Sequence, residues 1–162
     1  ILSFKNILSS LNKNYSLVIC GSLKDEGLRL KEITKELLID DKVIFTDFVV
    51  DYDLPYFHNA SDLFVYPSSY EGFGLPILEA MSCQTPVITS NTSSIPEVAN
   101  NSAILIDPFD KSALSEAMLR VLNSPSLLAE YGEKGYKNSL KFTWSNTAKL
   151  TLSAYIDILR EN

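Results

Sequence analysis

Histidine and cysteine are scarce in this sequence, which has one His and two Cys among 162 residues. Cys20 and Cys83 form no Cys-x-x-Cys pair and neither is close to His58 along the chain, so we expect no metal site. A histidine-dependent catalytic site would need His58. We expect this residue to be a partly exposed position on a short helix and not a catalytic base. Such cysteine usage is typical of a reducing compartment, and we expect a cytoplasmic protein.

Basic residues and long apolar runs are also few. The chain holds 14 Lys+Arg against 20 Asp+Glu, a formal net charge of −6, whereas a nucleic-acid partner would require a basic surface. No apolar run approaches the roughly 18–20 residues that span a bilayer, and we expect no signal peptide. We therefore expect a soluble protein that binds no nucleic acid, with no indication of membrane contact.

Hydrophobic residues make up 46% of the chain, an ordinary globular composition. Short apolar runs of strand length occur at residues 17–21, 43–45, 62–67, 86–89 and 103–106. None alternates apolar with polar positions, so we expect both faces of each strand to be buried. Helical spacing occurs between or before them, at residues 4–11, 28–38, 54–60 and 75–82. The pattern predicts one α/β domain over residues 1–162, with a Rossmann-like parallel sheet and helices on both faces.

The last third of the chain is predicted to be helical. One helix covers residues 114–121, with Asp110 as its N-cap and a stop at residues 123–125. A second includes residues 127–131, and a third includes residues 144–159. The apolar stripe of this third helix indicates a core or docking face.

The densest chemical signal lies in residues 66–80. Here a strand leads through Gly72-Phe73-Gly74 into a helix with Pro76 in its first turn, where proline is tolerated. A glycine-rich loop that enters a helix presents unpaired N–H groups and the positive end of a dipole, which together bind phosphate. Ile77 occupies the place of the third glycine in G-x-G-x-x-G, so the nicotinamide-nucleotide fingerprint is absent.

Two carboxylates, Glu71 and Glu79, flank this glycine turn. Glu79 is one helical turn after Leu75 and therefore shares its face. In that position its carboxylate could accept hydrogen bonds from both hydroxyls of a ribose. It could equally stabilise the helix N-terminus by its charge alone. The spacing favours neither role over the other.

The run Glu71-Gly-Phe-Gly-Leu-Pro-Ile-Leu-Glu79, followed by Thr85-Pro-Val-Ile88 and Ser94-Ile-Pro-Glu97, resembles the C-terminal domain of retaining glycosyltransferases with the GT-B fold. It is most similar to the large group-1 family (family 4), which carries two glutamates separated by seven residues in this setting. The resemblance extends from Lys5 to Trp144. It implies a domain that binds a nucleotide diphosphate-sugar donor as substrate, without a cofactor. It also implies an N-terminal acceptor-binding domain, and a first strand and an arginine ahead of Ile1.

The resemblance assigns roles to single residues. Glu79 would hold the ribose hydroxyls, and Glu71 would contact the hydroxyls of the donor sugar. The diphosphate would meet the backbone of Gly72, Phe73, Gly74 and Leu75. Lys5, in a Lys-Asn pair that opens the first helix, would neutralise the leaving diphosphate; an ordinary surface lysine is the other interpretation. Val49, in the loop of residues 47–50, would lie against the nucleobase.

The implied reaction is transfer of a sugar to an acceptor with retained anomeric configuration, in glycan or polysaccharide biosynthesis. A non-catalytic nucleotide-sugar-binding module is the alternative, and an epimerase or phosphorylase of related fold is a third. Two features lie outside this chemistry. Gln84 replaces a glycine common in the family, and Ser94 with Glu97 fits a helix capping box.

Overall fold

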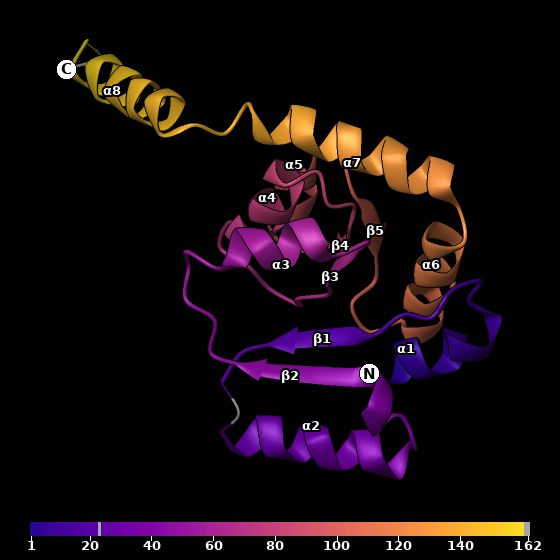
Figure 1. The fold of residues 1–162 in the computed structure, drawn as a ribbon. Coiled ribbons are helices and arrows are strands. Elements are labelled where there is room, and N and C mark those ends of the chain that lie inside the picture. Colours follow the sequence, from indigo (N-terminus) through magenta and orange to yellow (C-terminus); the bar gives the residue numbers. More distant parts are fainter. Residues whose placement is uncertain (23, 161–162) are drawn as a thin grey trace.

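Figure 1 shows the fold in a computed structural model, which describes residues 1–22 and 24–160. The strands are β1 (Leu17–Cys20), β2 (Val43–Asp47), β3 (Phe64–Tyr66), β4 (Val87–Ser90) and β5 (Ile104–Ile106). The helices of the first two thirds are α1 (Leu2–Ile7), α2 (Asp25–Glu36), α3 (Leu54–Ala60), α4 (Leu75–Ser82) and α5 (Ile95–Ala99). The last third holds α6 (Lys111–Leu122), α7 (Pro125–Ser139) and α8 (Trp144–Arg160). Every predicted strand and helix is therefore confirmed, with small changes at the ends.

The strands form two parallel sheets. In one, β1 pairs with β2, and Leu17 lies opposite Val43. In the other, β4 lies between β3 and β5, and Ile88 is opposite both Val65 and Ile104. The predicted α/β class is confirmed, with the parallel strands divided between two sheets instead of one.

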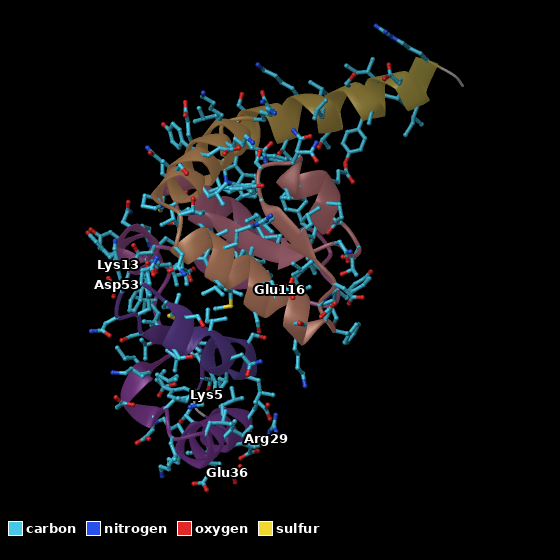
Figure 2. The ribbon with its side chains drawn as sticks, turned by 90° about the vertical axis from the view of Figure 1, so that its right-hand side faces the viewer. Lys5, Lys13, Arg29, Glu36, Asp53 and Glu116 are labelled. Atoms are coloured by element: carbon cyan, nitrogen blue, oxygen red, sulfur yellow. The ribbon has the colours of Figure 1, made fainter. Side chains whose placement is uncertain are left out.

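The first sheet differs from the prediction in its burial. β4 is buried at every position, but Val18 of β1 and Ile44 of β2 are 41% and 52% exposed. These two side chains lie opposite each other in the register, on one face of the sheet. Helix α2 covers the other face, where the Lys31 ammonium lies 5.6 Å from the centre of the Phe45 ring. The prediction that both faces of every strand are buried is therefore wrong for β1 and β2, because only one of their faces is covered. The charged residues Arg29 and Glu36 project from α2 into solvent (Figure 2).

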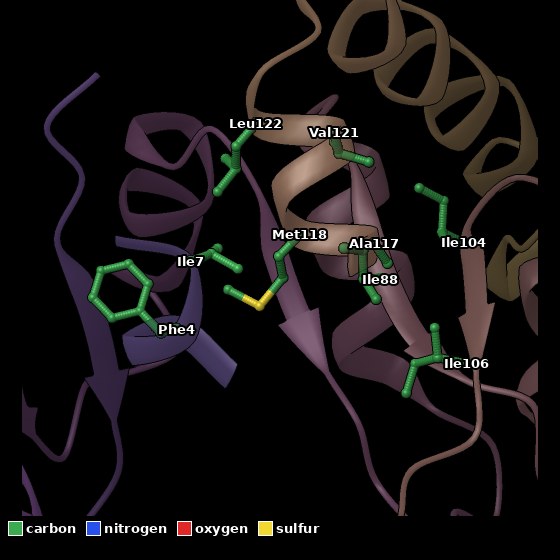
Figure 3. Close-up of a cluster of buried hydrophobic side chains, with 9 residues drawn as sticks. All are labelled: Phe4, Ile7, Ile88, Ile104, Ile106, Ala117, Met118, Val121 and Leu122. Carbon is green, nitrogen blue, oxygen red and sulfur yellow. The ribbon is translucent and has the colours of Figure 1, made fainter. Parts of the chain in front are cut away.

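The core of the second sheet has two parts, one on each face. Figure 3 shows the first, in which α1 and α6 pack against β4 and β5 through Phe4, Ile7, Ile88, Ile104, Ile106, Ala117, Met118, Val121 and Leu122. The other part joins α4 and α5 to β4 through Ile77, Leu78, Ala80, Met81, Val87, Ile95, Val98, Ala99 and Ala103. Each large apolar side chain buried in this way contributes about 1.5–3 kcal/mol. The prediction of helices on both faces is thus confirmed for this sheet.

The ends of the C-terminal helices follow the predicted signals. The Asp110 carboxylate accepts hydrogen bonds from the N–H groups of Ser112 and Ala113, both at 2.9 Å, and so caps α6 as predicted. Helix α8 is confirmed as a helix, yet the described part of the chain buries none of its residues, and Trp144 is 84% exposed. Its apolar stripe is therefore not part of this core. No helix within residues 1–22 and 24–160 has both the length and the apolar character needed to cross a bilayer.

His58 is a core residue, and the prediction of partial exposure is wrong. Its ring on α3 meets the ring of Phe64 edge to face, with centroids 5.0 Å apart. Its carbonyl oxygen accepts a hydrogen bond of 2.7 Å from the Thr85 hydroxyl. Burial lowers the pKa of His58 below its ordinary value of 6.5, which favours the neutral ring. These contacts give His58 a role in packing.

Helix α7 approaches α4 closely because it carries two glycines. A Cβ on Gly132 would lie 2.6 Å from the carbonyl oxygen of Gln84, and one on Gly135 would lie 3.0 Å from Cγ of Met81. Gln84 itself has a φ of +59°, in the left-handed region. This conformation explains the glycine that is common at this position in the family that the sequence resembles. The Asn138 side chain is buried at the end of α7 and donates a hydrogen bond to the Val98 carbonyl at 2.8 Å.

The contact between α7 and the Gln84 turn predicts that substitution by alanine destabilises the fold at Gly132 but not at Gly72. Gly132→Ala forces a Cβ against a backbone oxygen, and we expect a net loss of about 1–2 kcal/mol in the free energy of unfolding. Gly72→Ala is the matched control, because a Cβ there meets no atom within 4 Å; its effect should stay within about 0.5 kcal/mol. Urea denaturation measures both. Equal stability of Gly132→Ala and the parent chain would contradict the packing described.

Candidate functional site

The segment from Pro67 to Gly74, termed the glycine loop, joins β3 to α4. Gly74 ends it with φ +102° and ψ 44°, a left-handed conformation, and Pro76 follows in the first turn of α4 as predicted. Within the described residues no hydrogen-bond acceptor is recorded for the amides of Gly72, Phe73, Gly74 and Leu75. Unpaired amides at the start of a helix are suited to binding an anion.

Hydroxyl side chains that follow β4 hold the glycine loop. Ser93 Oγ accepts a hydrogen bond from the Glu71 N–H at 3.0 Å and lies 2.8 Å from the Glu71 carbonyl oxygen, to which it can donate. Ser94 Oγ lies 2.9 Å from the Glu71 carbonyl and 3.2 Å from that of Phe73. The Thr92 hydroxyl donates to the Ser69 carbonyl at 3.1 Å. The main chain around Glu71 is therefore fixed from a neighbouring strand end.

The predicted capping box at Ser94 and Glu97 is wrong. Ser94 is the N-cap of α5, but its side chain makes no cap hydrogen bond because its hydroxyl is directed to the glycine loop. Sequence reasoning missed this contact, although the run Ser90-Asn-Thr-Ser-Ser94 after a buried strand was a visible signal.

Glu71 is held by its side chain as well. The hydroxyl of Tyr66, the last residue of β3, donates a 2.5 Å hydrogen bond to Oε1 of Glu71. Burial raises the pKa of Tyr66 to about 12, and the hydrogen bond to Glu71 and the charges of Glu71 and Glu79 contribute to this shift. Both predicted carboxylates thus lie within electrostatic reach of one phenol. Tyr66 was not among the site residues predicted from the sequence.

Glu79 lies on the exposed side of α4, on the same face as the exposed Leu75, as predicted. Its carboxylate has no hydrogen-bond or ion-pair partner recorded among residues 1–22 and 24–160. Glu79 is the fifth residue of the helix, and the attraction of a helix N-terminus for a negative charge fades beyond the first turn. The position therefore argues against helix stabilisation by Glu79, and its ligand-binding role remains a prediction.

Lys5 and Val49 lie on other elements. Lys5 is exposed in the last turn of α1 instead of opening the helix, and it has no ion-pair partner among the residues described. Figure 2 shows it in the part of the molecule that also carries Arg29. Val49 is half-buried in the loop after β2, whose last residue Asp47 accepts a hydrogen bond from the Gly21 N–H at 3.1 Å. No hydrogen bond is recorded between the glycine loop and either residue, and their assigned roles remain predictions.

The turn before α3 contains an Asp-x-Asp sequence, Asp51-Tyr52-Asp53, with both carboxylates exposed. Asp-x-Asp pairs are a possible source of metal ligands. In the described part of the chain, no three His, Cys, Asp or Glu side chains gather closely enough to hold a metal ion. The expectation that the site uses no metal remains a prediction.

Comparison with known proteins places this geometry in context. The model of the family described as Glycosyl transferases group 1 matches residues 1–138. O-antigen chain mannosyltransferase B of Escherichia coli is 38% identical over 141 residues, which cover 87% of this chain and 37% of that protein. Sucrose-phosphate synthase from Thermosynechococcus elongatus superposes with a TM-score of 0.83 and 25% identity, over 99% of this chain and 42% of that chain.

A further solved structure shares the fold at lower identity. Anabaena HepE in complex with UDP and glucose superposes with a TM-score of 0.81 and 18% identity, over 96% of this chain and 44% of that chain. The chain therefore spans about two fifths of the length of these relatives. The family model nevertheless covers most of this chain, including both glutamates and the glycine loop. The predicted resemblance is confirmed, and the chain belongs to the family of group 1 glycosyl transferases.

Proposed function

We propose that this chain binds the nucleotide diphosphate-sugar donor of a retaining glycosyltransferase, which moves the sugar to an acceptor in glycan or polysaccharide biosynthesis. One observation carries the proposal: the amides from Gly72 to Leu75, for which the described residues offer no recorded acceptor, lie along the chain between Glu71 and Glu79, and both of these carboxylates act on the Tyr66 phenol. Amides are suited to phosphate oxygens and carboxylates to sugar hydroxyls. The name of the mannosyltransferase relative and the UDP and glucose in the HepE complex support this assignment.

Each group has a distinct task in the proposed complex. The amides of the glycine loop and the start of α4 bind the diphosphate and stabilise the charge that develops on it as it leaves. Lys5 adds a positive charge to the same diphosphate. Glu79 accepts hydrogen bonds from the ribose diol, Glu71 contacts the hydroxyls of the donor sugar, and Val49 lies against the nucleobase. None of these tasks requires a cofactor.

The rest of the proposed enzyme lies in another domain. Because the chain spans about two fifths of its relatives, we infer that an N-terminal acceptor-binding domain of the same protein completes the active site. Cys20 and Cys83 are both free thiols, which suits a cytoplasmic enzyme.

The ribose assignment predicts a charge-dependent loss of affinity. Glu79→Gln keeps the side-chain size but removes the charge, which weakens hydrogen bonds that contribute roughly 1.5–3 kcal/mol. The affinity for the nucleoside diphosphate should therefore fall about tenfold to hundredfold. Calorimetric titration with UDP and with GDP measures it. Glu36→Gln on α2 is the matched control (Figure 2), and equal affinity of both variants would contradict the assignment.

The diphosphate assignment predicts that a side chain in front of the amides blocks binding. Gly74 is unsuitable for this test, because its left-handed backbone and a Cβ 3.2 Å from Ile77 Cδ1 would strain the fold. Gly72 faces open space, so Gly72→Val should fold normally and cover the amides. We expect at least tenfold weaker binding of the nucleoside diphosphate and a smaller change for the monophosphate. A folded variant with unchanged diphosphate affinity would place the phosphates elsewhere.

The two-domain proposal predicts binding without catalysis by this chain. Positioning of the acceptor contributes several kcal/mol to catalysis, and closure of two domains excludes water from the cleft. The purified 162-residue chain should bind nucleotide sugars and transfer no label from them to a broad set of acceptors. Robust transfer by this chain would contradict the need for a second domain.

A further inference from the structure

We propose that Tyr66 is a positioning residue of this site, whose hydroxyl orients the Glu71 carboxylate so that Oε2 is presented to the hydroxyls of the donor sugar. The inference rests on the proposed function, because it specifies how one of the two glutamates is aimed. It assigns to the end of β3 a role in recognising the sugar, separate from binding of the diphosphate.

The hydrogen bond itself is short and reaches only one carboxylate oxygen. The Tyr66 hydroxyl lies 2.5 Å from Glu71 Oε1, the range of O–H···O⁻ bonds that are strengthened by charge. No partner for Oε2 of Glu71 is recorded among the residues that the structure describes. One oxygen is therefore fixed by the protein, and the other remains able to accept from a ligand.

The phenol is itself rigidly held. Its ring stacks on that of Phe64, two residues earlier on the same face of β3, with centroids 5.8 Å apart and planes 14° apart. Phe64 is in turn packed edge to face by the buried His58. The Tyr66 carbonyl accepts a 2.8 Å hydrogen bond from the Thr89 hydroxyl of β4. A group supported by a strand and a ring stack positions a partner more accurately than a loop residue does.

Glu71 is thereby fixed at both ends. Ser93 and Ser94 hold its main chain, while Tyr66 holds its carboxylate. Without the phenol, the main chain would keep its position but the side chain would regain rotational freedom, which binding would have to remove again. The loss should therefore affect ligands that contact the carboxylate and spare those that contact only the glycine-loop amides.

A neutral donor suits this position. The pKa of Tyr66 is raised to about 12, first by burial and then by the hydrogen bond and the two glutamate charges, so the hydroxyl remains protonated at physiological pH. A lysine or arginine would orient Glu71 too, but it would also neutralise the charge. Tyr66 orients the carboxylate and leaves its negative charge available for hydrogen bonds with sugar hydroxyls.

The test compares two ligands and two tyrosines. Tyr66→Phe removes only the hydroxyl and keeps the ring stack. The matched control Tyr155→Phe removes a hydroxyl from α8, outside the proposed site, where Tyr155 is 62% exposed. Calorimetry measures the affinity of each variant for two ligand pairs, UDP and UDP-glucose, and GDP and GDP-mannose. For Tyr66→Phe we expect about three- to tenfold weaker binding of the nucleotide sugar, with less than twofold change for the diphosphate. Tyr155→Phe should change neither.

A spectroscopic measurement tests the hydrogen bond without any ligand. In protein labelled at tyrosine Cζ, the signal that is lost in Tyr66→Phe belongs to Tyr66. In the parent chain this signal should titrate near pH 12. In Glu71→Gln the titration should move down but stay above pH 10, because burial still raises the pKa while the carboxylate no longer does. An unchanged titration in Glu71→Gln would overturn the contact.

The outcomes separate this inference from the function on which it rests. If the parent chain binds neither diphosphates nor nucleotide sugars, the proposed function fails, and the role of Tyr66 fails with it. If the parent binds a nucleotide sugar and Tyr66→Phe binds it equally well, the positioning role alone is overturned. Equal weakening of diphosphate and nucleotide sugar would show that Tyr66 supports the loop as a whole, which also overturns it.

Discussion

The site depends on hydrogen bonds between hydroxyl side chains that follow β4 and the main chain of the glycine loop. Ser93 and Ser94 form hydrogen bonds with the N–H and carbonyl of Glu71. Within the described residues, no protein acceptor is recorded for the next four amides. A largely exposed loop with two glycines would otherwise sample many conformations. The hydroxyl contacts select one in which the amides stay together at the start of α4 and Glu71 lies near Tyr66.

Much of the architecture could be predicted because it follows from local patterns. Apolar runs and helical spacing predicted each strand and every α-helix except α5, which only the motif at Ser94 and Glu97 indicated, and Asp110 capped α6 as expected. The division into two sheets and the exposure of Val18 and Ile44 could not be predicted in this way. Sequence patterns show which residues suit a strand, whereas burial of a strand face depends on whether another element covers it.

The candidate site was predictable where a motif carries the chemistry and unpredictable where long-range contacts do. The two glutamates and the glycine loop were recognised from their spacing, and the structure puts Glu71 and Glu79 within electrostatic reach of one phenol. Ser94 was assigned to a helix cap, since a capping box is a local pattern, yet its hydroxyl contacts residues more than twenty positions away. Tyr66 matched an ordinary strand position, and only its contact with Glu71 distinguishes it.

The central claim is that the amides from Gly72 to Leu75 bind the diphosphate of the donor. Backbone amide NMR during titration with a nucleoside diphosphate reads these groups one by one. We expect the largest shifts at Gly72, Phe73, Gly74 and Leu75. Binding with unchanged amides in the glycine loop, and with the largest shifts on α2 or α6 instead, would contradict it.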